Sequence, residues 1–474
     1  MANKNKKDTE IEYTAKSAWE TMTESQIKNV MHFGKGYIDF LNAVHTERQT
    51  SEFIIEKAVK AGFKDFQEVV SGQKDYVPGE KYYYSIHGKS VILAATGTED
   101  PAQGVNIVGS HIDAPRLDLK PNPLYEEKDF AYAKTHYYGG IKKYQWTAIP
   151  LAMYGVVFTR DGKQVEISVG DKPGDPMFTI TDLLPHLAAD QMKKGASEFI
   201  PAENLNLLLG SVPLKDEDGA YSVKSYIVDY LHREYGIVQR DLASAEIEIV
   251  PAFKACDIGF DRSFTGAYAQ DDRVCAYASL MAILDLKKPG RKTAVCYFSD
   301  KEEVGSMGNT GARSVAFENF MAELCFAYSS EHSEIRTRRA LAASNMLSAD
   351  VSGGYDPIYA DAFDRHNAAY LGRGVALEKY TGSRGKSGAS DANPEFIAKV
   401  TAVFDKAGVP WQRSELGRMD LGGGGTIAQY MADLGINIID CGVPVLSMHA
   451  PFEVTSKADL YWTYKGYEAF LKEM

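Results

Sequence analysis

The chain has 474 residues, and its 64 acidic and 52 basic residues give a formal net charge of −12. Hydrophobic residues make up 45% and charged residues 24%, which is typical of a globular protein and excludes disorder or a collagen-like repeat for most of the chain. The acidic balance argues against a nucleic-acid partner, and the length predicts two or three domains of roughly 150 residues.

The chain begins with a polar segment that no apolar stretch follows, so we expect no secretory signal. Its longest apolar stretch, near residues 148–158, is shorter than the about 20 residues that span a bilayer. The five cysteines are widely spaced and form no C-x-x-C motif, which favours buried thiols over disulfides. We therefore expect a cytoplasmic protein that does not enter a membrane.

The expected elements change in character along the chain. Apolar residues recur near the helix period through the first sixty residues, and strand-like runs follow between residues 81 and 113. The stretch from about 122 to 249 contains YYGG, a DKPGDP turn cluster and a helix-like segment at 222–235, so we interpret it as an inserted module.

From residue 251 onward, strands and helices alternate. TAVCYFS and INIIDCGVPVLS are strand-like, whereas RVCAYASLMAILDL and GTIAQYMADLG are helical in pattern. Such alternation predicts an α/β fold with a mixed, mostly parallel sheet flanked by helices. We therefore predict one catalytic domain, residues 1–120 and 250–474, that is split by a β-rich insertion at 121–249.

Polar residues with metal-binding chemistry follow several of these strands. His111 and Asp113 lie two apart in VGSHIDAPRLD, so an extended backbone directs both side chains to one side. A carboxylate in that position can orient a metal-bound imidazole, although H-x-D is common by chance.

Two acidic pairs lie further along. Asp271 and Asp272 open a helix in AYAQDDRV, where an acidic residue also serves as a simple N-cap. Glu302 and Glu303 follow a buried strand in FSDKEEVGSMGNTGA; such pairs are routine on solvated helices, but open α/β sheets bind ligands beyond the carboxyl ends of their strands.

Asp350 in MLSADVSGG and His449 in VPVLSMHAPFE complete the set, although each alone is as consistent with a loop carboxylate or a core histidine. Two histidines with carboxylates suit Zn²⁺ or a similar divalent ion. Two such ions, roughly 3.5–4 Å apart, can share one carboxylate, and a further glutamate can carry the proton. The set is chemically complete for hydrolysis.

The motifs GSHIDAPRLDLKPNPLYE, QDDR, SDKEEVGSMGNTGA, LSADVSGGYDP, RMDLGGGGTIA and DCGVPVLSMHAPFE resemble those of the M18 metallo-aminopeptidases, in order and over nearly the whole chain. The resemblance implies a zinc-peptidase-like fold and a centre of two divalent ions, zinc or else cobalt or manganese. It implies one ion held by His111, Asp271 and Asp350 and the other by Glu303 and His449.

The resemblance also implies roles for the remaining residues. Asp271 would bridge the two ions, Glu302 would be the general base and Asp113 would support His111. The inserted segment would be a dimerisation domain, with dimers assembling into a tetrahedral dodecamer. It would lend a histidine to the neighbouring active site, and His186 in DLLPHLA matches that position.

The identity of the N-terminal residue that is removed stays open. GGIKKYQW and TGSRGKSGASD offer Lys142, Lys143, Arg384 and Lys386 to an acidic side chain, but neither stretch follows the mammalian aspartyl aminopeptidase pattern closely. The GGGG run leads into a helix, so Gly423 and Gly424 are candidates for binding substrate through exposed N–H groups.

The function that we predict is removal of N-terminal residues from peptides. The alternative is a related dinuclear carboxypeptidase or aminoacylase, in which Arg384 or Arg418 would hold a substrate carboxylate. A non-catalytic assembly protein with a relic metal site is a third possibility, but no ligand and no base is missing from the set.

Overall fold

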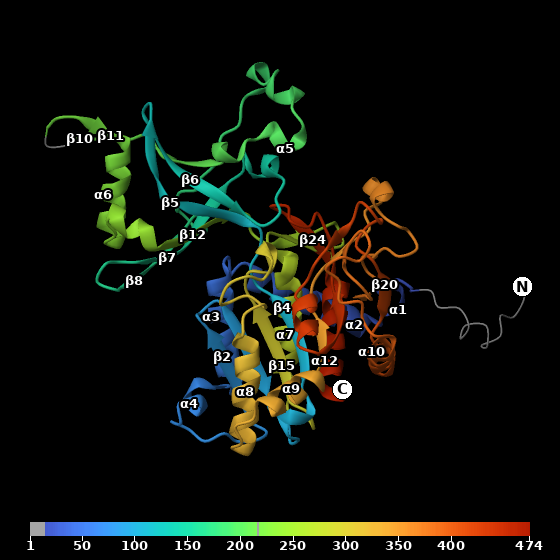
Figure 1. The fold of residues 1–474 in the computed structure, drawn as a ribbon. Coiled ribbons are helices and arrows are strands. Elements are labelled where there is room, and N and C mark those ends of the chain that lie inside the picture. Colours follow the sequence, from blue (N-terminus) through green and yellow to red (C-terminus); the bar gives the residue numbers. More distant parts are fainter. Residues whose placement is uncertain (1–14, 216–217) are drawn as a thin grey trace, which may run out of the picture.

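The computed structural model describes residues 15–215 and 218–474. The polar start of the chain, on which the expectation about a secretory signal depends, is outside these ranges. Figure 1 shows two bodies, one built around a large sheet and one projecting from it. The helices are α1 (Ala18–Thr21), α2 (Glu24–Leu41), α3 (Glu47–Lys60), α4 (Gln67–Val70), α5 (Ala196–Phe199), α6 (Val223–Tyr235), α7 (Gln270–Leu284), α8 (Ala316–Ser329), α9 (Glu334–Ala342), α10 (Pro394–Ala407), α11 (Ala428–Asp433) and α12 (Lys457–Glu473).

The larger body contains a nine-stranded mixed sheet in the order β1-β2-β3-β15-β4-β16-β22-β18-β20. Its strands are β1 (Lys64–Asp65), β2 (Lys81–Ile86), β3 (Ser90–Ala95), β4 (Asn106–His111), β15 (Ala294–Ser299), β16 (Asn345–Ser348), β18 (Val375–Glu378), β20 (Trp411–Ser414) and β22 (Asn437–Gly442). The four central strands, β15, β4, β16 and β22, run parallel. Strands β3 and β18 pair antiparallel at the two sides of this group.

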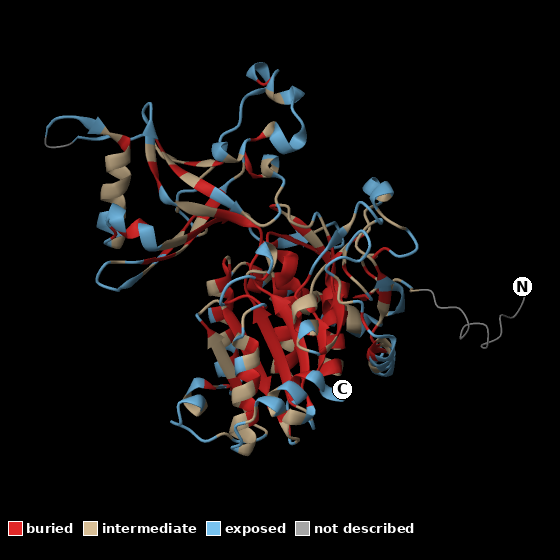
Figure 2. Ribbon diagram, viewed as in Figure 1, coloured by how far each residue is buried: buried red, intermediate tan, exposed pale blue. Residues whose placement is uncertain are grey.

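Helices cover both faces of this sheet, which explains why its central strands are almost entirely buried. Every residue of β4 and of β15 is buried, as expected of strands covered on both faces. Successive side chains of β15 point to opposite faces: Cys296 packs in the core under α2, α7 and α12, and Tyr297 packs in the core under α8 and α9. Figure 2 shows this sheet as the most continuously buried part of the molecule.

Smaller sheets lie beside it. A five-stranded sheet has the order β13-β14-β24-β23-β17, and β19 pairs with β21. These strands are β13 (Cys256–Ile258), β14 (Phe264–Ala267), β17 (Ser352–Gly353), β19 (Gly382–Ser383), β21 (Gly423–Gly424), β23 (Pro444–Leu446) and β24 (Glu453–Ser456).

The projecting body, which we call the second domain, is built on a six-stranded antiparallel sheet in the order β8-β7-β12-β5-β6-β9. Helix α6 contacts β5, β6 and β9 (Figure 1). The core includes Trp146, Leu207 and Ile249. The six strands are β5 (Arg116–Glu127), β6 (Phe130–Tyr138), β7 (Leu151–Phe158), β8 (Gln164–Val169), β9 (Asn206–Gly210) and β12 (Ala245–Pro251). Two short strands, β10 (Leu214–Lys215) and β11 (Tyr221–Ser222), pair with each other in a separate sheet.

The predicted fold class is confirmed: a mixed sheet flanked by helices carries an additional β-rich domain. The division of the chain at residues 120 and 249 stays a prediction, as does the role of the second domain in dimerisation.

Candidate metal centre

Three neighbouring parallel strands place most of the candidate ligands at one edge of the large sheet. His111 is the last residue of β4, and Asp350 lies two residues beyond β16. Glu302 and Glu303 open the short 3₁₀-helix η7 (Glu302–Val304), just beyond β15. Because β15, β4 and β16 are adjacent and parallel, their carboxyl ends meet, which is where open α/β sheets bind ligands.

Asp271 lies between the two histidines. It comes from the first turn of α7, which follows β14, and His449 comes from the loop between β23 and β24. Asp271 Oδ1 is 3.2 Å from His111 Nε2, and Asp271 Oδ2 is 3.2 Å from His449 Nε2. One carboxylate thus offers a separate oxygen to each side, as a ligand shared by two ions must.

Within the described residues, two groups have ligand atoms that all lie within 4.8 Å of one another. One is His111, Asp271 and Glu303, and the other is His111, Asp272 and Asp350. His449 Nε2 lies 3.5 Å from Glu303 Oε2, beside the first group. The structure thus brings together all the ligands predicted from the sequence and adds Asp272, which the sequence analysis noted only at the helix start.

The charges in this cluster favour a cation. Burial, with the added repulsion of Asp271, raises the pKa of Glu303 well above its usual value, and burial raises that of Glu302 to about 7. Against the effect of burial, the hydrogen bond to Asp271 raises the pKa of His449 to about 10. Glu303 Oε1 and Asp272 Oδ1 are buried without a hydrogen-bond partner. Imidazoles and unpartnered carboxylate oxygens fit a divalent ion such as Zn²⁺.

Asp113 and Glu302 both lie next to the candidate ligand His111. His111 Nδ1, on the side of the ring opposite the ligand nitrogen, lies 3.0 Å from the backbone carbonyl oxygen of Asp113 and 3.3 Å from its Oδ1. Glu302 Oε2 lies 4.0 Å from His111 Nε2, at the margin of the cluster. Glu302 thus faces the ligand side of His111, and Asp113 faces its back.

The sequence analysis missed Glu453, which is 1% exposed and lies behind the centre. Glu453 Oε2 accepts from the backbone N–H of Asp271 at 3.1 Å, and Glu453 Oε1 accepts from that of His449 at 2.7 Å. Its only signal in the sequence is a lone glutamate four residues after His449.

The candidate substrate-binding residues fall into two places. Arg384, Lys386 and Gly423 line one small cavity of about 50 Å³, together with Arg418. Gly423 and Gly424 form β21, which pairs with β19, so the glycine run does not lead directly into α11. The structure thus joins the GGGG and SRGK segments. Lys142 and Lys143 lie apart from them, at the start of the 3₁₀-helix η2 (Lys143–Trp146) in the second domain.

His186 lies in the 3₁₀-helix η3 (Pro185–Leu187) of the second domain, where its side chain is exposed. Among the described residues, no hydrogen bond or ion pair joins it to the candidate metal centre. The role of His186 in a neighbouring active site stays a prediction.

Comparison with known proteins identifies the family. The family model described as "Aminopeptidase I zinc metalloprotease (M18)" matches residues 40–471. The chain belongs to the M18 family. It is 47% identical over 456 residues to a probable M18 family aminopeptidase 1 from Clostridium acetobutylicum, covering 96% of this chain and 98% of the relative. The predicted M18 resemblance is confirmed, and so is the prediction of a metallo-aminopeptidase, a hydrolase that acts on peptide bonds.

Solved M18 structures share the whole fold. The crystal structure of an M18 aminopeptidase from Thermotoga maritima matches with a TM-score of 0.92 at 42% identity, over 98% of this chain and 100% of that chain. Aminopeptidase I from Clostridium acetobutylicum matches with a TM-score of 0.90 at 45% identity, over 97% and 99% of the two chains. The second domain is therefore part of the fold that these M18 proteins share.

Two further sequence expectations concern the compartment. None of the helices in the described ranges has the length and hydropathy needed to cross a membrane. All five cysteines lie in the described part of the chain and are free thiols there, and four of them are buried.

Proposed function

We propose that this M18 protein is a cytoplasmic aminopeptidase with two divalent ions, zinc or else cobalt or manganese, in each active site. The observation that carries the proposal is the position of Asp271, with one carboxylate oxygen 3.2 Å from each of the two histidines. The free thiols support a reducing compartment.

The side chains divide into two ligand groups around Asp271. His111, Asp271 and Asp350 would hold one ion, with Asp272 beside them, and Asp271, Glu303 and His449 would hold the other. When bound, divalent ions of this kind polarise a carbonyl group and lower the pKa of water. The buried oxygens of Asp272 and Glu303 that lack a partner support this division.

Glu302 would be the general base. Its carboxylate lies at the margin of the cluster, 4.0 Å from His111 Nε2. From there it would accept a proton from the attacking water and return it to the departing amine. Asp113 would contact Nδ1 of His111, so that Nε2 is the nitrogen that is free to bind the ion.

The substrate would be a peptide with a free N-terminus. Its first side chain would meet the cavity of Arg384, Lys386 and Gly423, with Gly424 beside them. Lys142 and Lys143, on the second domain, would contact the substrate from a different direction. A panel of substrates with acidic and neutral first residues measures the preference of this cavity.

The second domain would join two copies of the chain, and its His186 would enter the neighbouring active site. Exposed apolar side chains surround this histidine: Leu183 is 48% exposed, Leu184 48% and Leu187 66%. Clustered exposed apolar residues are typical of an interface. The S. cerevisiae mApe1 dodecamer shares the fold, with a TM-score of 0.75 at 20% identity. We propose that dimers of this chain assemble likewise, into a tetrahedral dodecamer.

The test uses metal-free protein refilled with Zn²⁺, Co²⁺ or Mn²⁺ and a panel of amino-acid nitroanilides and peptides. Each peptide is supplied with a free and with an acetylated N-terminus. We expect cleavage of the free form alone; cleavage of the acetylated form would instead favour a carboxypeptidase or aminoacylase.

The same assay tests the base. Glu302→Gln should keep its bound metal and lose about 10²–10⁴-fold in turnover, the range that general acid–base catalysis supplies. Glu395→Gln, an exposed carboxylate in the first turn of α10, is the control and should behave like the unmodified protein. Substantial turnover by Glu302→Gln would contradict the role of the base.

A further inference from the structure

The end of strand β6, in the second domain, reaches the metal centre of the larger body. The hydroxyl of Tyr138, the last residue of β6, donates a hydrogen bond to Asp113 Oδ2 at 2.8 Å. Two residues later, the carbonyl of Gly140 lies 2.8 Å from His449 Nδ1. With Nε2 directed at Asp271, the Nδ1–H of His449 is the donor in this contact. One short segment therefore touches both sides of the candidate centre.

The residue between them is also in contact with the centre. Gly139 has φ of +72°, and a Cβ added there would lie 3.3 Å from Glu303 Cβ and 3.3 Å from Glu303 Oε2. Residues 138–140, which we call the YGG segment, thus face Asp113, Glu303 and His449 in turn.

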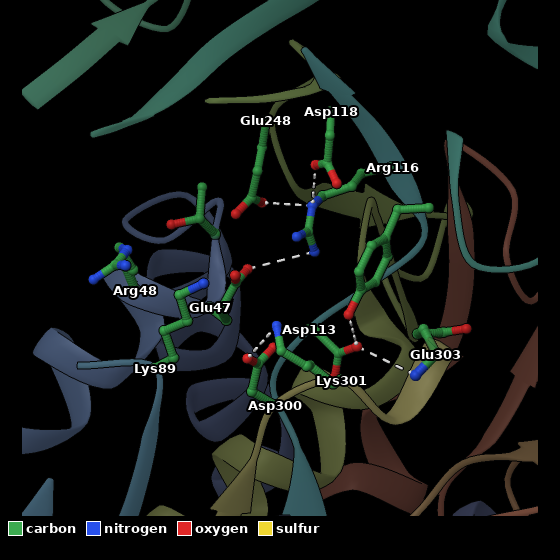
Figure 3. A network of polar contacts seen from close by, with 12 residues as sticks. Glu47, Arg48, Lys89, Asp113, Arg116, Asp118, Glu248, Asp300, Lys301 and Glu303 are labelled. Carbon is green, nitrogen blue, oxygen red and sulfur yellow. Dashed lines mark hydrogen bonds and ion pairs between the residues drawn. The ribbon is translucent and has the colours of Figure 1, made fainter. Parts of the chain in front are cut away.

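The carboxylate of Asp113, which accepts the hydrogen bond of Tyr138, also contacts residues of the candidate centre. Its Oδ1 accepts from the backbone N–H of Glu302 at 3.1 Å, and its Oδ2 accepts from that of Glu303 at 3.2 Å. Oδ1 also lies 3.3 Å from His111 Nδ1, beside the backbone carbonyl oxygen of Asp113 at 3.0 Å from the same nitrogen. Figure 3 shows Asp113 beside the turn that carries Glu303. A rotation of this one carboxylate would therefore disturb His111 and the turn that carries Glu302 and Glu303.

The ring of Tyr138 is itself fixed by a buried arginine. The guanidinium of Arg116, which is 4% exposed, stacks 3.9 Å from the centre of the ring. Arg116 Nε lies 2.8 Å from Asp118 and 3.2 Å from Glu248, and its Nη1 lies 3.4 Å from Glu47 (Figure 3). Glu47 begins α3 of the larger body, whereas Arg116 and Glu248 belong to strands of the second domain.

This buried ion cluster spans the junction of the two bodies, directly behind the tyrosine. Breaking a buried charge cluster is costly because the remaining partners lose their compensation. The ring of Tyr138 therefore has one defined position, and its hydroxyl has one acceptor. Burial and the nearby Asp113 charge raise the pKa of Tyr138 well above its usual value, so the hydroxyl keeps the proton that it donates.

We propose that Tyr138 is a positioning residue for the M18 active site: it holds Asp113, and through Asp113 it sets the orientation of His111 and of the Glu302–Glu303 turn. The YGG segment thereby makes the second domain part of the support of the metal centre. This inference rests on the metal centre of the proposed function.

The test is Tyr138→Phe, which keeps the ring over Arg116 and removes only the hydroxyl. Tyr137→Phe is the matched control, because Tyr137 is the preceding residue of β6 and is 41% exposed. For both variants, the Kd for Zn²⁺ is measured by competition with a chelator, and kcat and KM are measured on one nitroanilide substrate. Thermal unfolding is recorded alongside.

We expect Tyr138→Phe to weaken Zn²⁺ binding by about 10–100-fold and to lower kcat by a similar factor, with KM unchanged. Tyr137→Phe should match the unmodified protein in all three quantities. Because Tyr138 acts through Asp113, adding Tyr138→Phe to Asp113→Asn should cause little further loss, whereas independent effects would multiply.

Wild-type Zn²⁺ affinity and kcat in Tyr138→Phe, with or without a lower Tm, would overturn the positioning role. If the losses of the two single variants multiply in full in the double variant, Tyr138 does not act through Asp113. If Tyr138→Phe does not fold, Gly139→Ala takes its place, and unchanged Zn²⁺ affinity in that variant would overturn the role of the segment. If the unmodified protein itself binds no Zn²⁺ and cleaves no substrate, the proposed function fails instead.

Discussion

The carboxylate of Glu453 lies behind Asp271 and accepts the backbone N–H of that residue at 3.1 Å. The same oxygen accepts the N–H of Gln270 at 2.7 Å, and the other oxygen accepts the N–H of His449 at 2.7 Å. One buried side chain thus fixes the backbone of both Asp271 and His449, two of the candidate ligands. Strand pairing holds it in place, because Glu453 in β24 lies opposite Ala267 in β14.

Glu453→Gln should weaken metal binding although Glu453 belongs to neither candidate ligand group. An amide offers one acceptor oxygen where the carboxylate offers two, so either Asp271 or His449 loses its backbone partner. We expect about 10–100-fold weaker Zn²⁺ binding and a free energy of unfolding lower by about 1–3 kcal/mol. Chelator competition and urea unfolding measure the two effects.

The control for this experiment is Glu395→Gln, which removes an exposed carboxylate of α10. Zn²⁺ affinity at the level of the unmodified protein in Glu453→Gln would show that the backbone contacts do not position the ligands.

Much of the centre could be predicted from the sequence because its residues follow recognisable strands. The apolar runs before His111 and Glu302 identify buried strands, and parallel neighbours bring their carboxyl ends together. The strand before Asp350 is short, and its residues read from the sequence as a turn. Nothing in the local pattern shows that Asp271 and His449 face them, since both lie beside the five-stranded sheet. Their places were implied by the M18 resemblance.

The supporting residues could not be predicted, because their roles are contacts between distant segments. Glu453 acts through backbone N–H groups, which have no signature in a sequence. Tyr138 lies 25 positions from Asp113 and belongs to a different domain. The YYGG motif that contains Tyr138 indicated a turn in the inserted module, and only the fold shows that this turn lies against the metal centre.

Stability of the folded protein should fall as the pH rises from 5 to 8, in part because of Glu378. This glutamate is 5% exposed, at the end of β18, and its carboxylate accepts from the hydroxyls of Ser352 and Ser414. Burial, with the charges of Asp440 and Glu415, raises its pKa from 4.5 to about 7.

The sign of the effect follows from proton binding. A carboxyl group whose pKa is raised in the folded state binds its proton more tightly there than in the unfolded chain. Its contribution to stability is complete below the unfolded pKa, near 4.5, and is lost as the pH rises through about 7. A shift of this size corresponds to about 3 kcal/mol. Asp440, whose pKa burial raises to about 6, contributes in the same direction.

Glu378→Gln should therefore flatten the pH dependence. Urea unfolding at pH 5 and pH 8, with excess Zn²⁺ present at both, should show a smaller loss of stability in Glu378→Gln than in the unmodified protein. Glu395→Gln serves again as the exposed control. An equal loss in all three proteins would assign the pH dependence to other groups.

Substitution of His186 tests whether the second domain completes the site of a neighbour. His186→Ala should lower kcat, because a donor that would stabilise the transition state is lost, while Zn²⁺ affinity stays unchanged, since His186 is not a ligand. The control is His232→Ala, which removes an exposed histidine from α6 of the same domain.

Mixed assemblies then show whether His186 acts in the active site of a neighbouring subunit or not. His186→Ala subunits keep Glu302, and Glu302→Gln subunits keep His186, so each alone has little activity. If His186 enters the neighbouring site, co-refolding the two should restore activity well above the sum of the separate proteins, because a His186→Ala site then receives the histidine of its partner. Activity equal to that sum would place His186 outside the catalytic machinery of the neighbour.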